Sequence, residues 1–429
     1  MGFDAHQVIF VVGLKKSNGR FGSNVLQENN FLNLLLCGAL GTQLDLHEPD
    51  WDAIYLLSRT HNVLPIIYHG ISMLPGQSVP PEPLLSELKE YAFRLSIRQL
   101  QSYEALRTVL DAFKAHNIEV AVFKGILLAK LYRSAFSRVS CDSDLLIDPL
   151  DYAGAEAILL ELGYTYEKSS SADNVKSFVS DALSLDLHTR LWGDAYGRHN
   201  DVAGQMNLDA LEKRIKVNFM GMEIPTFGYE EHFIFLLIHL TKHFVVKGAG
   251  IRHFLDISLY YNAYMQYINL QHLWNSITEL GFKNLCLHIF KICIDYLGMD
   301  PQIMENQPFE PDAPVFNKLL TDVMDAGVFG NAQERAVAND VLRQSYYVGI
   351  SNKSRGWLRL HFLFPSPYAL STKYRYAKKC PVLTPVAWVH RLFSFLMHRV
   401  FQKEKMNISA TIDMADKRMS LLSDLNLIK

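Results

Sequence analysis

The chain has 429 residues, of which 49% are hydrophobic and 20% charged. This length and apolar content predict a folded globular protein of two or three domains with a sizeable core. Lys and Arg number 42 against 44 Asp and Glu, so the chain lacks the overall basic charge that is typical of nucleic-acid-binding proteins. The five cysteines are scattered without a CxxC pair, which argues against a cysteine zinc site and favours a reducing compartment.

The N-terminal stretch gives no sign of export. Residues 8–14 are apolar, but no basic segment precedes them and lysines follow them, so we do not interpret the run as a signal peptide. Residues 1–28 mix Gly, Ser, Asn and charge without periodicity, which predicts a loose leader. Because no uncharged apolar run reaches the roughly 18 residues that cross a bilayer, we expect a cytoplasmic protein without a transmembrane segment.

Hydrophobic periodicity divides the rest of the chain into four parts. In residues 29–112 apolar side chains recur at helical spacing, which predicts a helical N-terminal region. Residues 113–207 change to short β-rich runs separated by helical ones, in the order strand, helix, strand, helix, strand, strand. These runs are residues 118–123, 126–132, 140–148, 152–162, 164–166 and 183–188. The order predicts a small mixed α/β core.

Helical patterning returns after this core. Residues 208–340 are predicted to form a helical domain, with runs at 230–244, 251–264, 273–280, 284–297 and 315–324. Residues 341–429 form a basic and aromatic C-terminal helical region that ends in a predicted amphipathic helix, 385–401. This region could bind RNA or a membrane surface, or it could simply be solvated. The fold class that follows is α+β, with a small mixed sheet and its helices embedded between mainly α-helical regions.

Two carboxylates stand on the second predicted strand of the core. Asp142 and Asp144 are two residues apart, so both side chains project from the same face of a sheet. Like charges this close repel unless a cation lies between them, and Mg²⁺ prefers carboxylate, water and phosphate oxygens. A third acid, Asp186, lies on the last predicted strand. The three acids could hold two metal ions for phosphoryl transfer, or they could be a solvated turn and a structural carboxylate.

A lysine and a glycine follow the first predicted strand. Lys124 could contact a triphosphate or cap the strand, and Gly125 would let phosphate oxygens approach the backbone. Arg138 precedes the acids and could bind phosphate or neutralise Asp142. We therefore predict nucleotide binding by Lys124, Gly125 and Arg138, with a purely structural role for each as the alternative.

Three histidines are candidates for the acceptor side of the site. His239 and His243 are four residues apart on one face of a predicted helix, a spacing that can bind a transition metal, but no Glu follows His239 as in zinc proteases. A structural or acceptor-facing role is therefore favoured for this pair. His188 could order Asp186, face the acceptor or have no role.

The residues of the core resemble a known family. In order and spacing the chain is similar to the uncharacterised nucleotidyltransferase family NTP_transf_5, in the DNA-polymerase-β-like nucleotidyltransferase superfamily. The similar segments in the core are Val122–Gly125, Leu131–Tyr132, Arg138, Asp142–Leu146, Leu162–Tyr164 and Asp186–His188. Those outside it are Arg59–Pro65, His239–His243, Arg252, Asp256, Phe364–Pro365 and Tyr374. The chain departs from the superfamily at Lys124–Gly125, where Gly-Gly or Gly-Ser is usual.

The resemblance implies a polymerase-β-like fold, an NTP such as ATP as donor, and Mg²⁺, or Mn²⁺ in its place, bound by Asp142 and Asp144. We therefore expect transfer of a nucleoside monophosphate to a hydroxyl or phosphate acceptor, with release of pyrophosphate. A small molecule or peptide is favoured over nucleic acid as acceptor, and the sequence does not indicate an oligomeric state. Two alternatives stay open, a toxin-like transferase acting on protein or tRNA and a non-catalytic nucleotide-binding or scaffolding module.

Overall fold

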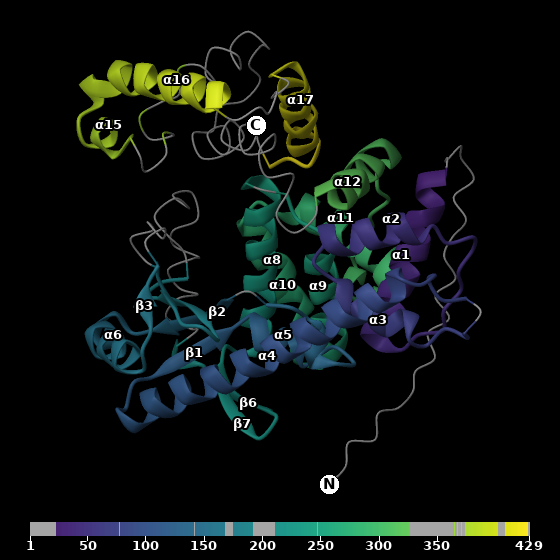
Figure 1. Ribbon diagram of the computed structural model, residues 1–429, viewed down its shortest axis with the longest axis horizontal. Helices are drawn as coiled ribbons and strands as arrows, with labels where there is room; N and C mark the ends of the chain where they lie inside the picture. The colour runs from purple at the N-terminus through teal and green to yellow at the C-terminus, as the bar shows by residue number, and fades with distance from the viewer. Residues whose placement is uncertain are drawn as a thin grey trace.

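A computed structural model describes residues 23–76, 78–140, 142–167, 175–191, 211–246 and 248–326. It also describes residues 364, 367, 370, 374–401 and 408–427. In this part of the chain a small sheet lies beside a larger group of helices, and the last helices lie above them in the view of Figure 1. Most of the predicted leader and most of the basic segment before residue 374 lie outside the described residues.

The N-terminal region is helical, as predicted. Its helices are α1 (Ser23–Leu40), α2 (Trp51–Thr60), α3 (Leu64–Ile71) and α4 (Leu84–Ala115). The first helix begins at Ser23, inside the predicted leader of residues 1–28. Its first turns are largely polar and show no apolar periodicity, but their side chains form hydrogen bonds to the segment just before α2. Gln27 accepts the backbone N–H of Asp50 at 2.8 Å, and Asn30 donates to the carbonyl of His47 at 2.8 Å.

The sheet of the core has five strands in the order β1-β2-β5-β4-β3. Its strands are β1 (Val120–Phe123), β2 (Asp142–Ile147), β3 (Thr165–Tyr166), β4 (Val175–Val179) and β5 (Ser184–His188). The helices α5 (Gly125–Ala129) and α6 (Tyr152–Glu161) follow β1 and β2. Only β2 and β5 pair in parallel; the other neighbours are antiparallel. The strand, helix, strand, helix pattern of the prediction is therefore confirmed.

Alternation along these strands gives the sheet two different faces. Val122, Leu145 and Leu185 point into a buried cluster that also contains apolar residues of α4 and α6. The residues between them point the other way, because successive side chains of a strand alternate. On β2 and β5 this second face carries Asp142, Asp144, Asp186 and His188.

Two features of the sheet region were missed by the sequence prediction. The strand β4 has weak alternation, and the hairpin of β6 (Ile215–Phe219) and β7 (Met222–Thr226) stands where helices were expected to dominate. The hairpin turns at Met220 and Gly221, which have φ values of 51° and 77°. Met-Gly lacks the Asn or Asp that usually signals such a turn, so local pattern does not predict this hairpin.

A second, larger core joins the N-terminal helices to the helical domain. This domain contains α8 (Tyr229–Val246), α9 (Ile251–Tyr264), α10 (Leu270–Glu279), α11 (Lys283–Leu297) and α12 (Ala313–Ala326). Their buried residues form one apolar cluster with those of α1 and α3. Gly38 and Gly70 let α1 and α3 touch, since a Cβ on Gly38 would lie 1.8 Å from the carbonyl oxygen of Ile66. The α+β fold class, a small mixed sheet between mainly helical regions, is confirmed.

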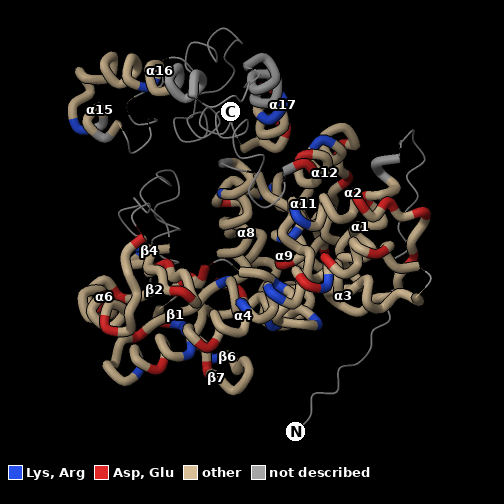
Figure 2. Tube along the Cα trace, in the orientation of Figure 1, with Lys and Arg blue, Asp and Glu red and all other residues tan. Residues whose placement is uncertain are grey.

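The C-terminal helices are α15 (Arg375–Lys379), α16 (Thr384–Phe401) and α17 (Ile408–Asp424). Short 3₁₀ turns connect several elements, at Ala135–Ser137, Pro149–Asp151, Met265–Tyr267, Pro301–Met304 and Pro381–Leu383. Within the described residues, every helix is too short or too polar to cross a bilayer. Basic and acidic residues are intermixed along the same part of the chain (Figure 2), in keeping with the near-neutral composition.

Candidate functional site

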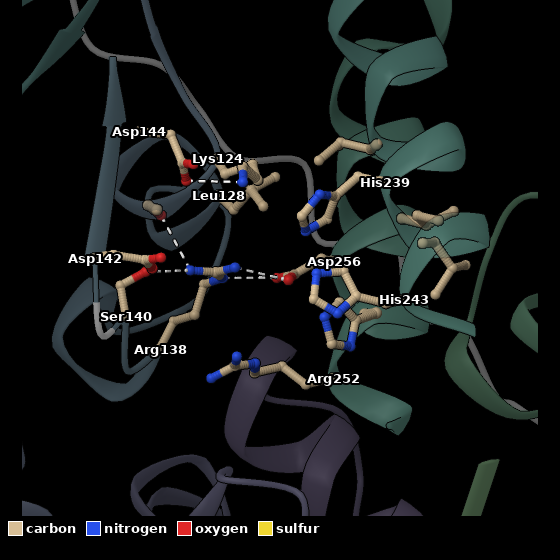
Figure 3. Close-up of a pocket in the computed structure, with 15 residues that line it drawn as sticks. Lys124, Leu128, Arg138, Ser140, Asp142, Asp144, His239, His243, Arg252 and Asp256 are labelled. Carbon is tan, nitrogen blue, oxygen red and sulfur yellow. Dashed lines mark hydrogen bonds and ion pairs between the residues drawn. The ribbon is translucent and has the colours of Figure 1, made fainter. Parts of the chain in front are cut away.

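A pocket of about 260 Å³ lies between the acidic face of the sheet and the helices α8 and α9. Lys124, Asp142 and Asp144 line one wall, and His239, His243 and other residues of α8 and α9 line the opposite wall (Figure 3). The pocket therefore brings residues of the predicted nucleotidyltransferase core against residues of the helical domain.

The turn between β1 and α5 has an uncommon backbone. Lys124 has φ 61° and ψ −143°, and Gly125 has φ 38°. A residue with a Cβ in such a conformation typically costs about 1–3 kcal/mol, so the lysine is placed where a glycine would be more stable. Its backbone N–H donates to Nε2 of His232 on α8 at 3.3 Å. This bond ties the turn to the helical domain.

The side chain of Lys124 turns towards the acids. Its Nζ lies 2.8 Å from Oδ2 of Asp144 and within 5.3–5.7 Å of the ring centroids of Phe123 and Phe235. His188 contacts the other oxygen of the same carboxylate, with Nε2 3.0 Å from Oδ1. Asp144 is only 5% exposed. Burial by itself raises the pKa of Asp144, but Lys124 and then His188 hold that pKa well below its ordinary value.

The other two acids have different surroundings. Asp142 stands at the exposed end of β2, and partial loss of hydration, followed by repulsion from Asp144, raises its pKa. Asp186 is directly opposite Asp144 in the parallel pairing of β2 and β5, and Ser177 Oγ donates to its Oδ1. One side-chain donor atom from each of Asp144, Asp186 and His188 lies within 4.8 Å of the others. Such a group could hold a metal ion.

Arg138 has a buried partner outside the core. Its Nε and Nη2 donate to the two carboxylate oxygens of Asp256 on α9 at 2.7 and 2.8 Å. Its Nη1 donates to the carbonyl of Gly125 at 3.2 Å and to Ser140 Oγ at 3.1 Å, and Tyr132 donates to Asp256 at 2.8 Å. Burial opposes both charges, but each partner outweighs it, so the pKa of Arg138 is raised and that of Asp256 is lowered. Arg138 therefore holds the turn and α9 together.

The wall opposite the acids is rich in histidine. His239 and His243 lie on α8, and His253 lies in the first turn of α9, with ring centroids 4.4 Å apart for His239 and His243 and 5.3 Å apart for His243 and His253. The three rings are only partly accessible from the pocket. Burial lowers the pKa of His253 to about 4 and that of His239 well below its ordinary value. Both imidazoles are therefore neutral at neutral pH.

The structure brings together most of the residues singled out from the sequence. Lys124, Asp142, Asp144, Asp186 and His188 cluster at the sheet. His188 contacts Asp144 and not Asp186, while His239 and His243 form the facing wall. The roles assigned to these residues, and phosphate binding by Arg138, stay predictions.

Sequence reasoning gave no site role to three residues of the pocket wall, Arg252, His253 and Asp256. The helices α8 and α9 run one after the other, separated only by residues 247–250. The beginning of α9 therefore returns beside the end of α8. Arg252 and His253 follow this short connection directly, so their position in the sequence indicates that they lie near His243.

Comparisons with known proteins bear on the family. No curated protein matches the sequence. Among solved structures, a solution structure of the antibiotic-resistance factor ANT(2'')-Ia is similar at 13% identity, with a TM-score of 0.31, over 43% of this chain and 94% of that one. A likeness this loose carries nothing over to the present site.

The profile of the family described as uncharacterised nucleotidyltransferase, NTP_transf_5, matches residues 47–298. This segment is more than half of the chain and includes the sheet, the turn at Lys124 and both walls of the pocket. The chain therefore belongs to this nucleotidyltransferase family, as its motifs predicted.

Proposed function

We propose that the protein transfers a nucleoside monophosphate from an NTP to a hydroxyl or phosphate acceptor, with release of pyrophosphate. The observation that carries the proposal is the parallel register of β2 and β5, in which Asp144 is opposite Asp186 and Asp142 is two residues away on the same face. The three acids thus share one face of the sheet beside the turn at Lys124, and Asp142 and Asp144 open onto the pocket. Family membership supports the nucleotide donor.

The donor set fits a hard divalent cation. Asp142, Asp144 and Asp186 offer carboxylate oxygens, which are the ligands that Mg²⁺ and Mn²⁺ prefer. Burial and then repulsion from Asp144 raise the pKa of Asp142, and a cation bound between the two carboxylates would offset both effects. Two such ions would stabilise the negative charge on the attacking and departing oxygens of an in-line displacement. We propose that Asp142 and Asp144 hold the ions and that Asp186 shares the one on the acceptor side.

The residues at the turn would receive the triphosphate. Lys124 is paired with Asp144, and this contact is through one ammonium group that can rotate towards a phosphate oxygen. The strained backbone of Lys124 supports this role, because a side chain kept at such a position offers something that glycine does not. Gly125 supplies the positive φ without a Cβ.

In the proposed reaction an oxygen of the acceptor attacks the α-phosphorus of the NTP. A new bond forms between that oxygen and phosphorus, and the bond from the α-phosphorus to the oxygen bridging to the β-phosphorus breaks. Pyrophosphate leaves with the electron pair of that bond. The proton of an acceptor hydroxyl passes to the carboxylate of Asp186, which lies beside Asp144 on the same face of the sheet.

The acceptor is proposed to bind against the helical wall. His239, His243 and Arg252 line that side of a pocket of about 260 Å³. This size suits a small molecule or the end of a peptide, and the basic and acidic residues intermixed along the described part of the chain do not favour nucleic acid (Figure 2). Specificity for the acceptor should therefore depend on α8 and α9 and not on the sheet.

A direct test is transfer of label from α-³²P-labelled NTPs with Mg²⁺, with an extract of the source cells as acceptor pool. The native chain should transfer label, and the double variant Asp142→Asn/Asp144→Asn should not. Asp181→Asn, which changes an exposed acid in the turn before β5, is the matched control and should retain transfer. Label in macromolecules would favour the toxin-like alternative, in which the acceptor is a protein or tRNA.

One observation favours a second candidate function. Asp144 already has cationic or hydrogen-bonding partners on both oxygens, Lys124 and His188. A self-neutralised carboxylate of this kind could bind a nucleotide without turnover, as in a nucleotide-binding or scaffolding module. Binding of Mg²⁺ and NTP without transfer by the native chain, and without loss of binding in the double variant, would favour that function and contradict metal ligation by the two acids.

A further inference from the structure

A group of three imidazoles lies across the pocket from the acids, in the wall against which the acceptor is proposed to bind. We propose that His239, His243 and His253, hereafter the histidine trio, form a binding site for a divalent transition metal of the zinc class. This site is separate from the carboxylates of the sheet and does not depend on the proposed nucleotidyl transfer.

The geometry of the trio supplies three ligands from two helices. His239 and His243 are one turn apart on α8, a spacing that places two imidazoles on one helical face. His253 comes from the first turn of α9. One ring nitrogen from each of the three residues lies within 4.8 Å of the others. Around a tetrahedral Zn²⁺, with Zn–N of about 2.0–2.1 Å, ligand nitrogens lie about 3.4 Å apart. Small side-chain rotations would bring the trio to that spacing.

The surroundings of the trio orient two of its rings. Nδ1 of His253 lies 3.4 Å from the carbonyl oxygen of Gly250. A proton on that nitrogen would point to the carbonyl and leave Nε2 for the metal, as is usual for metal-binding histidines. The ring of His239 stacks on Phe235, with ring centroids 5.8 Å apart and planes 19° apart. These contacts reduce the conformational freedom that the side chains would lose on binding a metal.

The donor set selects the metal. Three imidazole nitrogens suit Zn²⁺, Co²⁺ or Ni²⁺, whereas Mg²⁺ and Ca²⁺ require oxygen ligands. The nearby carboxylate of Asp256 is already bonded through both oxygens to Arg138, so it is not counted as a ligand. Three protein ligands leave one position of a tetrahedral ion open, as in catalytic zinc sites. Because the trio lines the pocket, the open position faces the space where an oxygen donor of an acceptor would bind.

The charges around the pocket permit a second cation. Lys124, Arg138 and Arg252 would repel the metal, but Asp142, Asp144 and Asp256 line the same pocket and equal them in number. Figure 3 shows His239 and His243 projecting from the helical wall towards the space in front of these acids. The trio and the acids therefore face each other without sharing a ligand.

The test is titration of the chelator-treated full chain with Co²⁺, whose visible absorption bands report tetrahedral nitrogen coordination, followed by displacement with Zn²⁺. We expect one equivalent of tetrahedral Co²⁺, displaced by one equivalent of Zn²⁺. Because loss of an outer partner of a metal ligand typically weakens binding about 10–100-fold, His243→Ala and His253→Ala should each weaken it by more than about 100-fold. The exposed His47→Ala is the matched control and should bind as the native chain does.

Two further measurements keep the proposal open to refutation. Asp142→Asn/Asp144→Asn should retain the Co²⁺ bands, and loss of the bands in that variant would place the ion at the sheet and overturn the proposal. If the histidine variants do not fold, X-ray absorption of the Zn²⁺-loaded native chain decides. A first shell with three imidazole nitrogens supports the trio, and a shell of oxygens, or no bound Zn²⁺, overturns it.

Discussion

The buried pair of Arg138 and Asp256 should be the main polar link between the sheet region and the helical domain. Both side chains are 6% exposed, and two charge-assisted hydrogen bonds of 2.7 and 2.8 Å join them. Removing one member of such a pair leaves a buried charge without its partner, which typically costs about 3–5 kcal/mol. We therefore expect Arg138→Met to lower the free energy of unfolding by about that amount. Solvent screening reduces this figure little, because neither group is exposed.

The assay is urea denaturation followed by circular dichroism, with the variant compared to the native chain. In Arg138→Met the carboxylate of Asp256 keeps only the hydrogen bond from Tyr132 among the bonds described above. The double variant Arg138→Met/Asp256→Asn removes both charges and keeps an oxygen that can accept from Tyr132. It should therefore be more stable than Arg138→Met alone, because no charge is left buried.

A second consequence concerns the site. Arg138 also donates to the carbonyl of Gly125 and to Ser140, so its loss should disturb the turn that is proposed to bind the triphosphate. A fall of less than about 1 kcal/mol in the free energy of unfolding of Arg138→Met, or a double variant less stable than the single one, would show that the buried charge pair does not stabilise the fold as proposed. The link between the two regions would then depend on apolar packing alone.

Two other predictions concern stability. The His61 imidazole is fully buried, donates to the Met324 carbonyl at 3.0 Å and accepts the N–H of Ile251 at 3.3 Å, and burial lowers its pKa to about 4. Its unfolded pKa is about 6.5, so the unfolded state binds more protons between these values, and about 3 kcal/mol of stability should be lost as the pH falls from 6.5 to 4. Urea titrations over this range should show a shallower loss for His61→Gln, and an unchanged pH profile would contradict the neutral buried imidazole. Gly38→Ala places a Cβ 1.8 Å from the Ile66 carbonyl oxygen and should lower the free energy of unfolding by about 1–3 kcal/mol. Gly76→Ala, which meets nothing within 4 Å, should change it little, and equal effects of the two substitutions would argue against the close contact of α1 and α3.

The central strands and the acids could be predicted because both depend on local pattern. Residues 120–123, just before Lys124, are all apolar, and two carboxylates separated by one residue must share a face of whichever strand carries them. Asp186 lies between Leu185 and Leu187, and this alternation likewise places it on the face opposite the apolar side chains. What the pattern could not supply is register. The parallel pairing puts Asp186 opposite Asp144 and joins segments about 40 residues apart in the sequence. The pattern within a single strand does not specify such a pairing.

The missed elements and contacts have physical explanations too. The β6–β7 hairpin turns through Met220 and Gly221, without the usual Asn or Asp signal. Arg138 looked equally suitable for phosphate or for a neighbouring acid, and its partner Asp256 belongs to a helix of another region. His253 was missed because its role depends on the return of α9 beside α8 and not on spacing within one helix. Long-range packing decided each of these points, and the sequence pattern reports mainly local structure.

We propose that the acidic face of β2 and β5 takes part in nucleotidyl transfer and does not merely bind nucleotides. The most direct test is transfer of label from α-³²P-labelled NTP by Asp186→Asn, measured beside NTP binding by the same variant and beside Asp181→Asn. Asp186 is opposite Asp144 in register, whereas the ion pair of Lys124 is with Asp144, so we expect loss of transfer with folding and NTP binding retained. Transfer at the native rate by Asp186→Asn would contradict the role proposed for Asp186 in the transfer step.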